Sequence, residues 1–193
     1  YAVIANCNII INSNIAVDPN VVGHAAAIDY VKGQALALRA LVHYDLVRLF
    51  GQQHVGEGGG DMNSLGVAYV KQFLDVNNMK PKRNSVGEVK AFIYADLDQA
   101  LAIMDKNLDK TFDKKAIRTV AVNAIKARVA LYFGDWSIAR TASQAVLSTA
   151  GARVLSATEY PESFKANLQP NSIFELSFIS DDNRGNDSLF NIF

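Results

Sequence analysis

The chain has 193 residues, half of them apolar, which is enough for one domain with a substantial core and too few for us to expect two. Nineteen basic and nineteen acidic side chains cancel, so no net charge attracts nucleic acid or an anionic membrane. A single cysteine, Cys7, excludes an internal disulfide. We therefore expect one domain, or part of one, over residues 1–193 and no nucleic-acid partner.

The first part of the chain predicts two helices. An apolar run at 2–13 predicts the first, although its three consecutive isoleucines would also suit a strand. Asp18 provides an N-cap and Pro19 a first helical residue, which predicts a long second helix that ends at Gly51. Apolar residues cover more than half of the surface of this helix, so we expect it to be packed on two sides.

A long loop follows at 52–84, rich in glycine and asparagine and interrupted by the strand-like stretch GVAYV. Loops of that length are usually functional or mobile. Ser85 and Glu88 then form a capping box, and apolar residues recur at helical spacing from Val86 to Met104. This pattern predicts a third helix.

The last part of the chain predicts a helix pair and a small sheet element. Two apolar runs are separated by Gly134, Asp135 and Trp136. The glycine can adopt the left-handed conformation that closes one helix, and the aspartate can cap the next. We interpret Trp136 as a packing residue of this turn, with sugar stacking as the alternative. The alternation in SIFELSF predicts a β-like segment at 172–180.

No motif predicts a catalytic or metal centre. The three histidines, His24, His43 and His54, do not have the spacing of metal ligands, and we interpret His43 as a satisfied interior histidine. GEGGGD lacks the Lys-Ser/Thr pair of a phosphate loop, and DDNRGND misplaces the glycine and the closing glutamate of a calcium loop. Asp96 and Asp98 point to different helix faces, and we attribute both to solvation or helix capping. We therefore expect no enzyme and no cofactor.

These elements predict a mainly α fold of tetratricopeptide-like antiparallel helix pairs, an α/α superhelix, with long irregular loops and a minor β element near the C-terminus. The tetratricopeptide consensus fits only in part, because Asn123, Ala130 and Ser143 stand where aromatic residues are usual. The pattern alone therefore does not decide for or against a tetratricopeptide-like solenoid.

The N-terminal residues allow a lipoprotein signal that ends at Cys7 as an alternative. Against it, no basic leader precedes Cys7, and Asn6 replaces the small residue expected before a cleavage site. No run approaches the roughly 20 apolar residues that span a bilayer. The sequence begins without a methionine, which leads us to expect a fragment or a trimmed product.

Several stretches of the sequence indicate a protein family more specifically than the helical periodicity does. They are ALRALVHYDLVRLFG, PKRNSVGEVKAFIYADLDQAL and AVNAIKARVALYFGDWSIA, with IANCNIII, LGVAYV and SIFELSF around them. In this order they resemble the SusD/RagB family, the nutrient-binding lipoproteins of the outer membrane in Bacteroidetes-type bacteria. Gly134-Asp135-Trp136 resembles the turn of the family's second helix pair. Ala68 departs from the proline that is common in the extended segment, and the family's usual length is more than twice that of this chain.

The resemblance implies binding without catalysis. Members of the family dock on a SusC-like TonB-dependent transporter and bind a glycan, or in some cases a peptide, at the cell surface. It also implies an outer-membrane location, with the membrane contacted only through a lipid anchor outside this sequence. The alternative is a protein-interaction scaffold without a small-molecule site, and a hydrolase assembled in space ranks third.

The family's sugar contacts vary in position, so the resemblance carries over none of them. We instead predict ligand-binding residues from the irregular stretches, where aromatic rings can stack on sugars and polar groups can bind hydroxyls. The predicted rings are Tyr69, Phe73 and Tyr160, and the predicted polar groups are Asn78, Asp181 and Asn183.

Overall fold

The structure is a computed structural model that describes residues 1–52, 61–74, 76, 79–109, 114–149, 151–165 and 170–176. Its α-helices are α1 Ala2–Ile11, α2 His24–Phe50, α3 Val86–Ile103, α4 Thr119–Tyr132, α5 Trp136–Leu147 and α6 Glu159–Ser163. A short 3-10 helix, η1, spans Lys106–Leu108. The predicted mainly α fold is confirmed.

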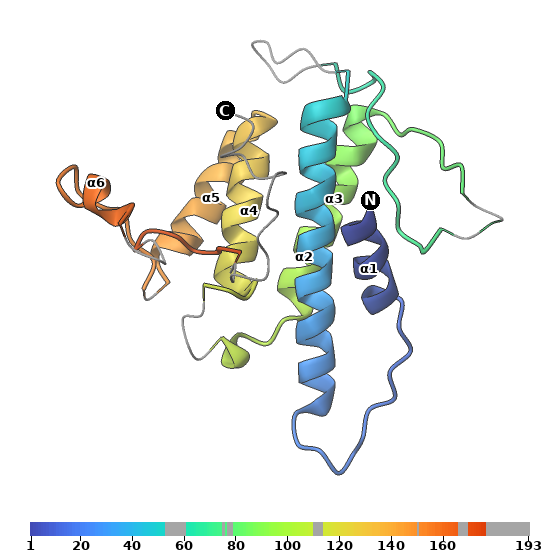
Figure 1. Ribbon diagram of the computed structural model, residues 1–193, viewed down its shortest axis with the longest axis horizontal. Coiled ribbons are helices and arrows are strands. Elements are labelled where there is room, and N and C mark those ends of the chain that lie inside the picture. Colours follow the sequence, from blue (N-terminus) through green and yellow to red (C-terminus); the bar gives the residue numbers. More distant parts are fainter. Residues whose placement is uncertain are drawn as a thin grey trace, which may run out of the picture.

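The helices form antiparallel pairs. α2 runs beside α3 and α4 runs beside α5, while α1 lies against α2 on its other side (Figure 1). α2 is therefore packed on two sides, as its apolar surface predicted. α6 lies beyond α5, on the opposite side of the molecule from α1 (Figure 1).

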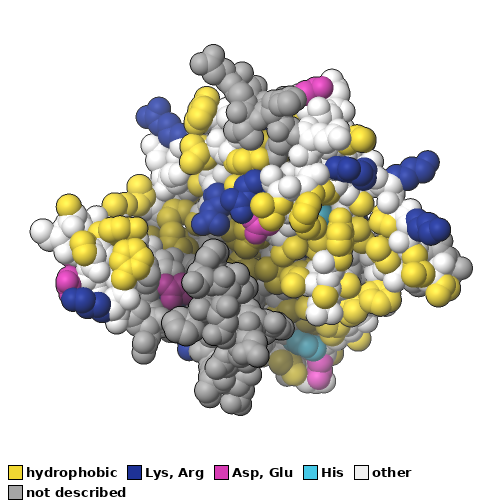
Figure 2. Space-filling view, turned by 45° about the horizontal axis from the view of Figure 1, so that its top comes forward, with side chains coloured by type: hydrophobic (Ala, Val, Ile, Leu, Met, Phe, Trp, Pro, Cys, Tyr) yellow, Lys and Arg dark blue, Asp and Glu magenta, His cyan; other side chains and the backbone are white. Residues whose placement is uncertain are grey.

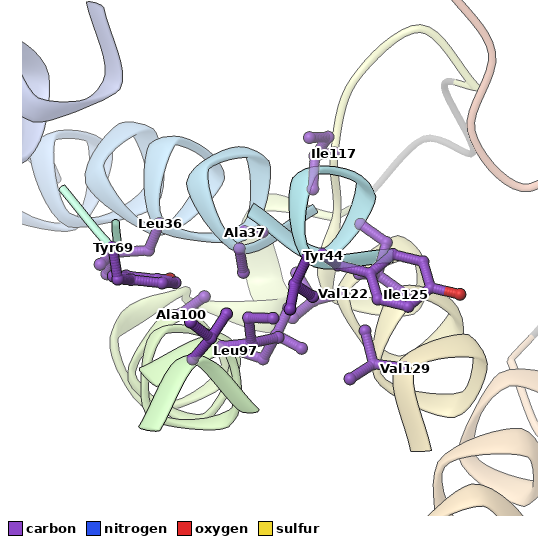
Figure 3. Packing of buried hydrophobic residues seen from close by; sticks show 14 of the residues in the cluster. Leu36, Ala37, Tyr44, Tyr69, Leu97, Ala100, Ile117, Val122, Ile125 and Val129 are labelled. Carbon is purple, nitrogen blue, oxygen red and sulfur yellow. The ribbon is translucent and has the colours of Figure 1, made fainter. Parts of the chain in front are cut away.

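The main core lies where α2, α3 and α4 meet (Figure 3). α3 contributes its predicted stripe, in which Val89, Ile93 and Leu97 are fully buried. α2 approaches the end of α3 closely at Gly33, where an added Cβ would lie 2.3 Å from the Cγ of Met104. A side chain at this position would force the methionine to move, so the glycine leaves the space that the Met104 side chain fills.

The start of α3 is as predicted, and the start of α2 is not. Ser85 and Glu88 form the predicted capping box, in which each side chain accepts from the other residue's backbone N–H. α2 begins at His24 rather than after Asp18, because the Asp18 carboxylate accepts from the N–H of Asn20, 2.9 Å away, and closes a turn there. Gly23, with φ of 79°, then precedes the helix.

The turn between α4 and α5 corrects two predictions. Gly134 has the predicted left-handed conformation, with φ of 74°. Asp135 does not cap α5 with its side chain: its carboxylate instead accepts from Lys90 Nζ at 2.8 Å and from the Tyr94 hydroxyl at 2.6 Å, both on α3. Trp136 is 67% exposed and is not the packing residue of the turn. Phe133, which is 4% exposed, fills the core there.

The predicted β-like segment at 172–180 is not a strand in its described part, residues 172–176. Its backbone meets the segment before α4, where the Glu175 N–H donates to the Lys114 carbonyl at 2.8 Å. One such bond does not make the repeated ladder of a sheet. Residues 177–180 lie outside the described part of the chain.

Candidate functional site

The stretch LGVAYV forms an extended segment that crosses the α1–α2–α3 group. Its backbone pairs with the residues before α3, since the Gly66 N–H donates to the Asn84 carbonyl at 2.8 Å and the Asn84 N–H donates to Val67 at 3.1 Å. Side chains alternate between two clusters, as expected of extended backbone. Val67 and Tyr69 join the main core, and Ala68 packs on the α1 side with Ile4.

A buried polar network holds this segment against three helices. Arg39 on α2 and Asp96 on α3 form a bidentate ion pair, with both N–O distances 2.7 Å and both side chains about one-twentieth exposed. Arg39 also donates to the side-chain carbonyl of Asn8 on α1, 2.8 Å away. Asn8 in turn donates to the carbonyls of Val70 and Gln72, each at 3.0 Å. The attribution of Asp96 to solvation or capping was wrong.

Tyr69 belongs to the same network. Its hydroxyl donates to Asp96 at 2.6 Å, and its ring stacks on that of His43 with centroids 3.8 Å apart. Burial and the negative charge of Asp96 raise the pKa of Tyr69, so the hydroxyl keeps the proton it donates. One ring face is therefore covered by protein, and the hydroxyl is already bonded.

His43 is a satisfied interior histidine, as predicted. Its Nε2 accepts from the Val70 N–H at 3.0 Å, so the proton lies on Nδ1, which donates to the Arg39 carbonyl at 2.8 Å. Burial lowers the pKa of His43 from 6.5 to about 4. A proton on Nε2 would remove the acceptor that holds the segment, so the neutral ring is the form that the fold requires.

We expect His43 to make the protein less stable in acid. The folded pKa lies below the unfolded one, so the unfolded chain binds the proton first and the stabilisation is lost between about pH 6.5 and pH 4. The free energy of unfolding should fall by about 2 kcal/mol more between pH 7 and pH 5 in the wild type than in His43→Gln. Denaturant titrations at the two pH values measure this difference, and an equal fall in both proteins would contradict it.

A pocket of about 480 Å³ opens beside the extended segment, and we call it the loop pocket. It is lined by residues of the stretch 69–74, by Lys80, Pro81 and Asn84 before α3, and by Phe92 on α3. Its lining residues are Tyr69, Val70, Lys71, Gln72, Leu74, Lys80, Pro81, Asn84 and Phe92. The volume lies in the usual range of small-ligand sites.

The structure does not bring the predicted ligand-binding residues together. Tyr69 lines the loop pocket from its buried position, and Phe73 is 54% exposed on the same segment. Tyr160 lies far from both on α6 (Figure 1), where it is 51% exposed and meets the ring of Phe164 edge to face at 5.2 Å. The predicted polar groups, Asn78, Asp181 and Asn183, lie outside the described residues.

Of the nine residues that line the loop pocket, our interpretation of the sequence predicted one, Tyr69. Among the eight that it missed are Lys71, Lys80 and Phe92, and the signal for the two lysines was the local charge. Residues 71–83 contain four basic side chains and one acidic side chain in a chain whose total charge is zero. Phe92 gave no signal, because it is one of several aromatic residues on an apolar helix.

Two further properties concern metals and membranes. Within the described ranges, His, Cys, Asp and Glu side chains do not gather in groups of three or more that could hold a metal ion. Among the described helices, none combines the length and the apolar character needed to cross a bilayer.

The sequence of residues 1–131 matches the SusD-like family model described as "Starch-binding associating with outer membrane". The chain belongs to the SusD-like family. No curated protein matches this SusD-like chain in sequence.

Solved structures with the same fold are also SusD-like. A SusD superfamily protein from Bacteroides thetaiotaomicron is 27% identical with a TM-score of 0.79, over 94% of this chain and 38% of that one. A candidate sugar-binding protein from Bacteroides vulgatus is 28% identical with a TM-score of 0.79, over 97% of this chain and 42% of that one. A SusD-like carbohydrate-binding protein from the same species shares the fold at 24% identity and a TM-score of 0.75, over 94% and 36%. The chain thus spans about two fifths of these structures.

Proposed function

We propose that the chain binds glycans at the bacterial outer membrane without transforming them. The observation that carries this proposal is the family match over residues 1–131, whose description names starch binding and association with the outer membrane. The candidate sugar-binding protein from Bacteroides vulgatus, similar along nearly the whole chain, adds support. We further propose that the bound glycan is delivered to a SusC-like TonB-dependent transporter.

The chemistry of the loop pocket suits a sugar. The pocket combines aromatic rings with the side-chain amides of Gln72 and Asn84, which can exchange hydrogen bonds with hydroxyl groups. Sugar sites in general use this combination, in which the apolar face of the ring meets an aromatic surface and the hydroxyls meet polar groups. Binding in this pocket requires no proton transfer and no bond breaking.

Affinity electrophoresis on a panel of neutral and acidic polysaccharides tests the proposed function. We expect at least one polysaccharide to retard the 193-residue chain relative to a non-binding protein of similar size and charge. Incubation should leave the chain length of the retarding glycan unchanged, as measured by reducing-end assay. Retardation by no member of the panel would favour the alternative, a helical scaffold that binds only protein partners.

A further inference from the structure

We propose that the loop pocket selects glycans that carry an anionic group, a carboxylate or a sulfate ester, and that Lys71 and Lys80 recognise it. This inference rests on the proposed function and names its class of ligand. A carboxylate and a sulfate ester share one chemistry, because each places on a sugar ring a compact anion that accepts hydrogen bonds from ammonium groups.

The charges that line the pocket are all of one sign. Lys71 and Lys80 are the two charged residues among the described lining, and neither forms an ion pair with a carboxylate of the described chain. In contrast, Lys90, Lys126 and Lys165 each pair with an aspartate or a glutamate. The lysines of the pocket therefore keep their charge available to a ligand.

Among the described residues, neighbouring carboxylates do not cancel this charge. Asp96 is neutralised by its bidentate pairing with Arg39. Glu88 accepts from the backbone N–H of Ser85 as the partner of the capping box, and it does not line the pocket. Several Lys and Arg side chains lie along the right-hand side of Figure 2, the side on which residues 61–85 run in Figure 1.

The fold holds the backbone of Lys71 and places its side chain on an aromatic ring. Its carbonyl accepts from the Asn12 side chain at 3.0 Å, which ties its backbone to the end of α1. Its ammonium lies 3.6 Å from the centroid of the Phe92 ring, a distance at which the ring attracts the cation without neutralising it. An anion offers the ammonium a stronger, charge-assisted hydrogen bond, so the side chain can turn from the ring to the ligand.

The pocket has room for a sugar and not only for a small ion. Its volume of about 480 Å³ exceeds what a carboxylate or sulfate group alone would fill. Gln72 and Asn84 add amide groups to the same lining, and these can contact the hydroxyls of the ring that carries the anion.

The test compares glycans that share a backbone with and without the anionic group. One pair is a galacturonate oligomer and its fully methyl-esterified form, and the other is a sulfated galactan oligomer and its desulfated form. Isothermal titration calorimetry of the whole chain should show at least one anionic oligomer bound about tenfold more tightly than its neutral form, with an advantage that shrinks as salt is raised. The oligomer that binds more tightly, the galacturonate or the sulfated galactan, shows which of the two anionic groups the pocket prefers.

Substitutions test whether Lys71 and Lys80 cause the preference for anionic glycans. The single changes Lys71→Gln and Lys80→Gln should each weaken the preference for the anionic oligomer, and the double change should abolish it. Lys82→Gln, which loses the same single charge outside the lining, should keep most of it. Thermal melting of each variant checks that the fold is retained. Equal binding of both anionic oligomers and their neutral forms, or an unchanged preference in the double variant, would overturn the inference and leave the proposed function standing. Failure of every glycan, including those of the electrophoresis panel, would overturn both.

Discussion

Asp96→Ala is expected to lower the free energy of unfolding by about 3–5 kcal/mol, because it leaves the buried guanidinium of Arg39 without its counter-charge. The same change removes the acceptor of the Tyr69 hydroxyl, 2.6 Å away, inside the core. Because Arg39, Asp96 and Tyr69 come from α2, α3 and the extended segment, all three elements lose a shared contact. Denaturant titration followed by circular dichroism measures the effect.

Asp98→Ala is the matched control. Asp98 lies one position beyond Leu97 on the same helix and pairs with Lys126, but its side chain is 58% exposed. Exposed pairs contribute little, so we expect a loss within about 1 kcal/mol. The double replacement of Arg39 by Met and Asp96 by Leu should recover part of the loss, since no buried charge then remains unpaired. Similar losses in the two single variants would show that the buried pair is not a main source of stability.

Phe133→Ala is expected to cost about 3–5 kcal/mol, whereas Trp136→Ala should cost less than about 1 kcal/mol. The two aromatic residues flank the same turn, but Phe133 is buried in the main core and Trp136 is 67% exposed. Removing the buried ring leaves a cavity, and removing the exposed ring leaves only solvent. Thermal melts of the two variants give the comparison directly, and a larger loss for Trp136→Ala would reverse the assignment.

Local signals in the sequence were sufficient for much of the helical frame. The capping box at Ser85 and the stripe through Ile93 and Leu97 placed α3 correctly, because both depend on residues within a few positions of one another. Gly134 marked the turn between α4 and α5 for the same reason, since its left-handed conformation suits glycine.

The buried faces of helices and the caps at helix ends were predicted less well where they depend on residues far away in the sequence. α4 is apolar on most of its surface, so its periodicity could not show that Leu131 faces outward. Asp135 and Asp18 both resembled helix caps, but each found another partner: Asp135 binds α3, and Asp18 closes a local turn. A short polar side chain before a helix offers several competing hydrogen bonds, and the sequence does not rank them.

The buried polar network was invisible for a related reason. Arg39 and Asp96 are 57 residues apart, and each alone resembles an ordinary charge on a helix. Tyr69 was predicted to bind a ligand because it lies in an irregular stretch, and the sequence did not show that residues 67–70 are buried and that the Tyr69 hydroxyl bonds to Asp96. The irregularity of a loop shows that its backbone is not helical, and it does not show which side chains face solvent.

The attachment of the extended segment has a consequence for ligand capture. Hydrogen bonds from Asn8 and Arg39, and one to His43, hold the backbone from Val70 to Gln72, so the fold itself fixes this part of the lining of the loop pocket. Ordering this part of the lining then costs little free energy on binding. Selectivity can come from its fixed geometry instead of from closure around the ligand. For the glycan that we propose as ligand, we therefore expect binding and release at rates set by diffusion and by the strength of the contacts.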